Sequence, residues 1–307
     1  MKRYEGKAFI SAGLVGGCEI VGNEGVVYLL GENEQFDKKT MSELGVREKS
    51  PMTCFVKHRI NNEFDISYWN LDGSQAKMCG HVSLIAANIL REIYDLEKLS
   101  LYFDISHYKE KIDNQLMVYF ENNLSFFETK AHDITTIKKT DFSDKQLKLV
   151  ELMGLKLNDV KEAIWANGLR DLTFVIKSST KMRTMEMNFR KIATILDQMD
   201  IRNLCSTTKS RQDDFDFETR IFCPHDNLDE DKACGSSSIP LTRYWSKEMG
   251  KNSFNVLYPY HLGYDDKKGG GTQVIKIIDG AVLVGGRCMC SIDETALTDR
   301  HCMYNAV

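Results

Sequence analysis

Two Cys-Gly dipeptides in similar surroundings constrain the fold of this 307-residue chain more than any other feature of its sequence. One segment, beginning at Ile66, is ISYWNLDGSQAKMCGHVSLIAANILREI, and the other, beginning at Thr219, is TRIFCPHDNLDEDKACGSSSIPLTRYWSKEM. In each, a strand and a polar turn of about ten residues lead to Cys-Gly at the start of an apolar helix. Their cysteines, Cys79 and Cys234, are 155 residues apart, about half the chain. Self-similarity at this spacing predicts two homologous halves, each with a central helix inside a curved sheet.

Many short strands and a few further helices are expected along the chain, which places it in the α+β class. The expected strands are 7–11, 18–21, 26–30, 53–58, 64–69, 116–120, 124–129, 160–165, 172–176, 215–222, 255–257, 273–278 and 281–289, and the further helices are 36–44, 143–153 and 184–199. We expect two pseudo-symmetric lobes, each a curved β-roll wrapped around its central helix, with the active site between the lobes. The N-terminal lobe is expected to cover residues 1–125 and to be completed by the last strand, at about 290–307, and the C-terminal lobe is expected to cover residues 126–289.

Charge and composition exclude several classes of function. Forty basic and forty-four acidic side chains give a net charge of −4, which argues against a nucleic-acid partner. No apolar run approaches the ~18 residues that cross a bilayer, so no membrane association is expected. Glu5 and several glycines interrupt the N-terminal segment, which does not resemble a signal peptide. Nine scattered cysteines are typical of reduced thiols, and we expect a cytoplasmic protein.

The chemistry of a cysteine at the start of a helix makes Cys79 and Cys234 candidate catalytic residues. Unpaired backbone N–H groups and the helix dipole favour the thiolate there, which predicts a pKa below the free value of about 8.5. The same N–H groups are suited to hold a carboxylate. If the two halves face each other, one thiolate removes a proton from a carbon beside a carboxylate and the opposite thiol delivers one to the other face. These are the parts needed to invert an amino-acid α-carbon without pyridoxal phosphate.

The other cysteines carry no such pattern. Four of them are expected to be small buried residues: Cys18, Cys54, Cys205 and Cys223. Cys288, Cys290 and Cys302 with His301 match no common zinc spacing, so no metal site is expected.

The first Cys-Gly segment resembles a family. Asn70-Leu-Asp-Gly-Ser74 followed by Met78-Cys79-Gly80 is similar to the N-x-DGS-x₄-CG segment of diaminopimelate epimerase, with the same asparagine-to-cysteine spacing. Ala233-Cys234-Gly235-Ser236 is similar to the second catalytic segment of that family, ACG[ST]. The resemblance implies that both cysteines are catalytic and that Asn70 contacts substrate.

The surrounding sequence is more similar to the related phenazine-biosynthesis PhzF-like proteins. Cys79-Gly80-His81 resembles their CGH motif, and Asn167-Gly168-Leu-Arg170 resembles NGPR. The stretch from Arg220 through Glu230-Asp231 to Gly235-Ser236 resembles R-x-F-x-P…EDPxTGS. The resemblance implies two similar lobes with the site between them, no metal or organic cofactor, and a homodimer.

Three departures from these families bear on the mechanism. Met52 stands where PhzF-like enzymes usually carry a glutamate acid/base. His225 and Asp226 stand where diaminopimelate epimerase has the Glu-Arg pair that recognises the distal end of its substrate. Pro240 removes a backbone N–H from the second helix, which predicts a kink or a late start.

The thiol pair and the resemblance together predict a cofactor-independent amino-acid racemase or epimerase. Cys79 and Cys234 are the expected acid/base pair, and the partner is a small-molecule amino acid or related carboxylate. The expected substrate-binding residues are Asn70, Gly80, His81, Asn167, Asp231, Gly235 and Ser236. Two alternatives stay open: a PhzF-like isomerase of an unsaturated carboxylate that uses Asp231 and His81, and a non-catalytic small-acid binding protein on the same scaffold.

Overall fold

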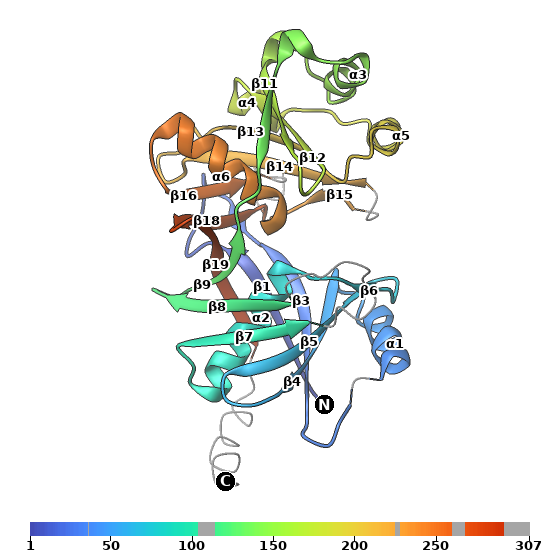
Figure 1. Cartoon of the computed structure of the whole chain (residues 1–307), viewed down its shortest axis with the longest axis vertical. Helices are drawn as coiled ribbons and strands as arrows, with labels where there is room; N and C mark the ends of the chain where they lie inside the picture. The colour runs from blue at the N-terminus through green and yellow to red at the C-terminus, as the bar shows by residue number, and fades with distance from the viewer. Residues whose placement is uncertain (36, 104–113, 225–227, 260–267, 292–307) are drawn as a thin grey trace. The chain divides into compact units, whose positions relative to one another are not determined.

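The computed structural model describes residues 1–35, 37–103, 114–224, 228–259 and 268–291 (Figure 1). They form two compact units, each assembled from separate stretches of chain. Of the described residues, the first contains those within Met1–Ile10, Gly22–Thr129 and Gly285–Ser291, and the second contains those within Ser11–Val21 and Lys130–Val284. Both contain helices and strands, so the expected mixture of the two is confirmed.

The boundaries differ from the expected ones in three places. Residues 126–129 and 285–289 were expected in the C-terminal lobe but belong to the first unit. Residues 11–21 were expected in the N-terminal lobe but belong to the second unit. Cys18 and Ile20 pack there against Leu257 in a small apolar cluster, and the backbone of strand β2 (Glu19–Ile20) pairs with β17 (Lys268–Gly269). Of the strand expected at about 290–307, residues 292–307 lie outside the described residues.

The first unit is a strand-rich fold around one long helix, α2. Its elements are β1 (Lys2–Ile10), β3 (Asn23–Leu30), α1 (Lys38–Glu48), β4 (Met52–His58), β5 (Glu63–Asn70), β6 (Gln75–Ala76), α2 (Gly80–Tyr94), β7 (Lys98–Phe103), β8 (Gln115–Glu121), β9 (Leu124–Lys130) and the end of β19 (Ala281–Ser291). β1 lies antiparallel to both β3 and β19, and β3 is parallel to β4. β5 is antiparallel to β4 and β6 and parallel to β7, which continues into the β7–β8–β9 meander.

Helix α2 is apolar nearly all round, as the sequence predicts. Nine of its fifteen residues are buried, and it contacts β1, β3, β4 and β7. The buried residues are Val82, Ser83, Leu84, Ile85, Ala86, Ala87, Ile89, Leu90 and Ile93. A helix enclosed in this way has a fixed position, and so does the residue that begins it.

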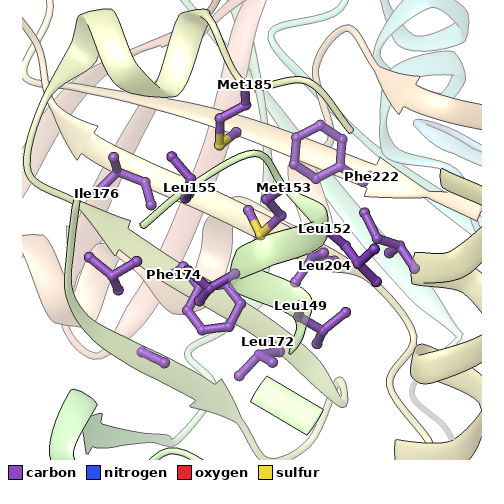
Figure 2. Close-up of a cluster of buried hydrophobic side chains, with 14 of the residues drawn as sticks. Leu149, Leu152, Met153, Leu155, Leu172, Phe174, Ile176, Met185, Leu204 and Phe222 are labelled. Carbon is purple, nitrogen blue, oxygen red and sulfur yellow. The ribbon is translucent and has the colours of Figure 1, made fainter. Parts of the chain in front are cut away.

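The second unit contains the remaining strands and helices. These are β2, β10 (Ile134–Lys138), the 3₁₀ helix η1 (Lys139–Asp141), α3 (Asp144–Leu152), the 3₁₀ helix η2 (Leu157–Asp159), β11 (Val160–Ala166), β12 (Asp171–Ile176), α4 (Ser179–Arg183), α5 (Phe189–Met199), β13 (Leu204–Lys209), β14 (Phe217–Cys223), β15 (Leu228–Asp231), α6 (Gly235–Met249), β16 (Ser253–Tyr258), β17 and β18 (Gly271–Ile278). Helices α3 and α5 pack on an apolar core that includes Leu196 of α5. Figure 2 shows Leu149, Phe174 and Phe222 of the same core.

The two units contain the same order of strand pairings. In the first, β3 is parallel to β4, β4 antiparallel to β5, and β5 antiparallel to β6 and parallel to β7. In the second, the five strands β12, β13, β14, β15 and β16 repeat these four relations in turn. The helix that follows the short fourth strand is fifteen residues long in both cases, α2 in one and α6 in the other.

One expected helix begins later than predicted. The amphipathic pattern predicted a helix over 184–199, but α5 begins at Phe189. Asn188 caps it, because its side chain accepts a hydrogen bond from the Lys191 amide at 3.2 Å. Met185 precedes the cap and is buried in the core, so the apolar residues that extended the helical pattern belong to a packed loop.

Candidate active site

Cys79 is the N-cap residue of α2 and lies at its exposed end. Its backbone is extended, with φ −138° and ψ 112°, and its side chain makes no capping hydrogen bond. The Cys79 carbonyl accepts hydrogen bonds from the Ser83 amide at 3.1 Å and the Ser83 hydroxyl at 2.7 Å. The cap therefore holds the backbone and leaves the thiol, which is half-buried, available for other contacts.

His81 contacts that thiol. Its Nδ1 lies 3.1 Å from Cys79 Sγ, and its Nε2 lies 3.2 Å from the carbonyl oxygen of Glu24 on β3. Both ring nitrogens are thus engaged within the first unit, and the ring is anchored against the sheet that encloses α2.

Gly80 is required by close packing at the same point. A Cβ on this residue would lie 2.9 Å from Cε1 and 3.0 Å from Cζ of Phe127, a ring that is 1% exposed. Because a buried ring cannot move aside, only glycine fits between the thiol and the helix without displacing the first turn.

Asn70 ends β5 and begins the turn that leads to Cys79. Its Nδ2 donates to Ser74 Oγ at 2.9 Å, and the Ser74 hydroxyl in turn donates to Asp72 at 2.6 Å. Met52, at the position of the glutamate in PhzF-like enzymes, is the cross-strand neighbour of Asn70. Met52 is 9% exposed and brings no ionisable group to this end of β5.

Cys234 is the N-cap residue of α6 in the same conformation, with φ −107° and ψ 110° and no capping side-chain bond. Its Sγ lies 3.4 Å from Ser236 Oγ and 3.7 Å from Ser237 Oγ. The Cys234 carbonyl accepts a hydrogen bond from the Tyr258 hydroxyl at 3.1 Å. Helix α6 begins directly at Gly235 although it contains Pro240, so the late start that Pro240 suggested is wrong.

An ion pair that the sequence did not indicate lies behind this thiol. Asp171, which is fully buried, accepts hydrogen bonds from Arg202 Nε at 2.8 Å and Nη2 at 2.6 Å, and from Ser237 Oγ at 2.8 Å. Arg202 also approaches Ser236 Oγ at 3.3 Å. The network fixes both serines that touch the thiol and places a guanidinium at the start of α6.

Asn167 belongs to the turn between β11 and β12 that precedes Asp171. It is exposed, and its amide donates to the carbonyl of Asp133 at 3.3 Å. A Cβ on the next residue, Gly168, would lie 3.0 Å from His132 Nδ1. Burial, and after it the positive charge of Arg202, lowers the pKa of His132, so this turn shares an electrostatic environment with Arg202.

Asp231 ends β15, three residues before Cys234. Its Oδ1 accepts a hydrogen bond from the Ala233 amide at 3.0 Å, which shapes the turn into α6. The preceding Glu230 is buried and forms a two-point ion pair with Arg220 at 2.6 and 2.7 Å. The charged residues of this motif therefore have two different roles. Arg220 and Glu230 stabilise the pairing of β14 with β15, and Asp231 lies close enough to Cys234 for its charge to act on the thiol.

The expected low pKa does not hold for Cys234. Burial is the main cause that raises the pKa of this thiol, and the negative charge of Asp231 adds to it, while Arg202 opposes both. The expectation considered only the helix N-terminus, but desolvation of the charged form is the larger effect here. Cys234 is therefore held as a thiol near neutral pH.

Each sequence-predicted site residue can now be placed. The first unit brings together Cys79, Gly80 and His81, with Asn70 in the adjoining turn, and the second brings together Cys234, Gly235, Ser236 and Asp231. Sequence reasoning missed Asp171, Arg202 and His132, because no motif links them and they are joined only by the fold.

The described residues contain neither a cluster of metal-ligating side chains nor a helix able to span a membrane. Among them, no group of three or more His, Cys, Asp or Glu side chains is arranged to hold a metal ion. Cys288 and Cys290 are free thiols on β19, and His301 and Cys302 lie outside the described residues. No helix in the described ranges has the length and apolar character to cross a bilayer.

Comparison with known sequences assigns a family to this fold. The family of phenazine biosynthesis-like proteins, PhzC-PhzF, matches the chain over residues 19–261. An uncharacterised isomerase of Halalkalibacterium halodurans is 25% identical over 229 residues, which cover 72% of this chain and 74% of that protein. The human phenazine biosynthesis-like domain-containing protein is 23% identical over 262 residues, which cover 79% and 84% respectively.

Solved structures show the same fold. A PhzF-family phenazine biosynthesis protein of Enterococcus faecalis superposes with a TM-score of 0.73 at 19% identity, covering 94% of this chain and 96% of that one. A predicted epimerase of Pseudomonas aeruginosa superposes with a TM-score of 0.66 at 15% identity and the same coverage. The resemblance read from the sequence motifs is confirmed.

Proposed function

This chain belongs to the PhzC-PhzF family of phenazine biosynthesis-like proteins, and from that membership we propose that it is a cofactor-independent isomerase of a small carboxylate. Several relatives are named as isomerases, which supports this class of reaction. Within the class, we propose racemisation or epimerisation of an amino acid, with Cys79 and Cys234 as the acid/base pair.

The observation that carries the proposal is the repeated N-cap cysteine. Two helices of fifteen residues, in equivalent places of the two units, begin after a cysteine with extended backbone and an uncapped side chain. A Ser, Thr, Asp or Asn is ordinarily favoured at this position because its oxygen bonds the first-turn amides. A thiol gives up that stabilisation, and keeping it at both helices is consistent with a chemical role.

In the proposed mechanism, one sulfur takes the α-proton and the other donates a proton to the opposite face of the same carbon. The electron pair of the broken C–H bond moves into the carboxylate as an enediolate. First-turn N–H groups of both helices stabilise that charge, and Arg202, held at the start of α6 by Asp171, adds a cation on one side. The mechanism requires an active site between the two units, with Cys79 on one side of the substrate and Cys234 on the other.

Hydrogen exchange at the α-carbon tests the proposal. The full chain is incubated in heavy water with a panel of L- and D-amino acids, and loss of the α-proton signal is followed by NMR. Cys79→Ser and Cys234→Ser are each expected to lower inversion by about 10²–10⁴-fold, the usual contribution of a general acid or base. Cys288→Ser, which alters a thiol of β19 outside both sites, is the matched control. Normal turnover by both site variants refutes the two-thiol mechanism.

A second candidate is the isomerisation of an unsaturated carboxylate, a proton shift without stereochemical inversion. It is favoured by two ionisable side chains beside the thiols, the His81 ring at 3.1 Å from Cys79 and the Asp231 carboxylate, whose charge raises the pKa of Cys234. In this mechanism Asp231→Asn abolishes turnover of the unsaturated acid, whereas Cys79→Ser and Cys234→Ser still turn it over. The same variants therefore separate the two candidates.

A further inference from the structure

The two thiols have different neighbours at equivalent positions. The residue two after Cys79 is His81, which lies 3.1 Å from the sulfur, and the residue two after Cys234 is Ser236, which lies 3.4 Å from its sulfur. The repeated topology makes these contacts counterparts, and only one of them contains a base. A serine hydroxyl does not accept a proton near neutral pH, whereas an imidazole does.

The hydrogen bonds of His81 determine which of its ring nitrogens carries the hydrogen and which can accept a proton from the thiol. A carbonyl oxygen only accepts, so Nε2 must carry the hydrogen that it shares with the Glu24 carbonyl at 3.2 Å. In the neutral ring the other nitrogen, Nδ1, then has its lone pair free to accept, and it is this atom that meets Cys79 Sγ. The second unit has hydroxyls at the corresponding place, and these are committed to Asp171 and Arg202.

Other titratable groups near Cys79 in the described part of the first unit are Cys54, Tyr68 and Glu24. Cys54 on β4 and Tyr68 on β5 are close enough to Cys79 for their charges to interact with it. Burial raises the pKa of both side chains, so both are neutral near pH 7. Glu24 of β3 turns its carboxylate to Lys7 of β1, at 3.2 Å. Cys54 and Tyr68 are therefore neutral neighbours of the sulfur near pH 7, whereas the His81 ring lies 3.1 Å from it.

We infer that His81 is the proton acceptor of the Cys79 thiol, so that the resting protein holds Cys79 as a thiolate and Cys234 as a thiol. The proton moves from Cys79 Sγ to His81 Nδ1, and the resulting imidazolium keeps its Nε2–H bond to Glu24. His81 is thus a positioning residue that acts through Cys79. Assigning Cys79 as the base and Cys234 as the acid of the reaction rests on the proposed function, but the thiolate–imidazolium pair does not.

Alkylation of the two thiols tests the inference without any substrate. The folded full chain is treated with iodoacetamide at a series of pH values, and the peptides that contain Cys79 and Cys234 are quantified by mass spectrometry. The midpoint of the rate profile is the useful quantity, because a thiol that ionises more easily is also a weaker nucleophile. We expect the midpoint for Cys79 to lie at least one pH unit below that for Cys234, a tenfold difference in thiolate population.

His81→Gln removes the base and keeps an N–H donor for the Glu24 carbonyl. It is expected to move the Cys79 midpoint up by one unit or more and to leave the Cys234 midpoint unchanged, which also reports that the variant is folded. Ser236→Ala is the matched variant at the counterpart position, and it should not move the Cys79 midpoint. Equal midpoints for the two thiols in the parent protein, or an unmoved Cys79 midpoint in folded His81→Gln, overturns the inference. If no amino acid exchanges its α-proton but the alkylation midpoints of Cys79 and Cys234 are as expected, the proposed function is rejected and the inference about His81 stands.

Discussion

Replacing Asp171 by asparagine tests whether the buried ion pair supports the second unit. The carboxylate is fully buried and accepts three hydrogen bonds, two from Arg202 and one from Ser237, at 2.6 to 2.8 Å. Asparagine keeps the shape, but it loses the charge and turns an N–H₂ group toward these donors. Breaking one side of a buried pair costs about 3–5 kcal/mol. The side chain of Arg202 is 34% exposed, so solvent screening reduces the expected loss to about 2–3 kcal/mol.

Urea unfolding followed by tryptophan fluorescence measures this loss, since Trp165 and Trp245 both lie in the second unit. The matched control is Asp200→Asn, which removes a carboxylate from Arg170 where the two side chains are 78% and 53% exposed. An exposed pair contributes less than about 1 kcal/mol. A loss in Asp171→Asn no greater than that of the control refutes the structural role of the buried pair. The variant should also alkylate Cys234 at lower pH, because Arg202 then acts on the thiol without its counter-ion.

Two further predictions concern the remaining site residues. Burial lowers the pKa of His132 in the folded protein. As the pH falls, His132 is therefore protonated more readily in the unfolded chain, which stabilises the unfolded state. The free energy of unfolding should fall more between about pH 7 and about pH 5 in the parent than in His132→Gln. In Gly80→Ala the new Cβ meets the Phe127 ring at 2.9 Å, and we expect a loss of about 1–3 kcal/mol in thermal unfolding and weaker exchange activity. Gly13→Ala, whose Cβ meets nothing within 4 Å, is the control for it, and an equal effect of the two contradicts the packing argument.

The sequence predicted the elements whose pattern is local. The apolar circumference of α2 and the Cys-Gly signal gave the helix and its first residue, and Ser143 was expected at the start of α3, where it forms a capping box with Gln146. The family followed from the same segments, because residue types and spacing at the two cysteines are a matter of sequence alone.

Strands with a polar interior escaped prediction. Strand β13 (Leu204–Lys209) is almost entirely buried although it contains Ser206, Thr207 and Thr208. Thr207 accepts from the Trp245 indole at 3.0 Å and donates to the Glu218 carbonyl at 2.9 Å, so its hydroxyl is satisfied inside the fold. A pattern based on apolar alternation does not detect such a strand. The pair of Asp171 and Arg202 escaped for a related reason, since residues 31 positions apart become partners only through strand pairing.

The pairing of β1 with β19 sets the order in which the two units can complete their folding during synthesis. Strand β1 lies against β19, with Glu5 opposite Ser291 and Lys7 opposite Met289. Every residue of the second unit has been translated once Val284 is added, but the first unit then still lacks part of its edge. On the ribosome the unit that contains β1 is therefore completed second: β1 can pair early with β3, but its other partner, β19, is made some 280 residues later.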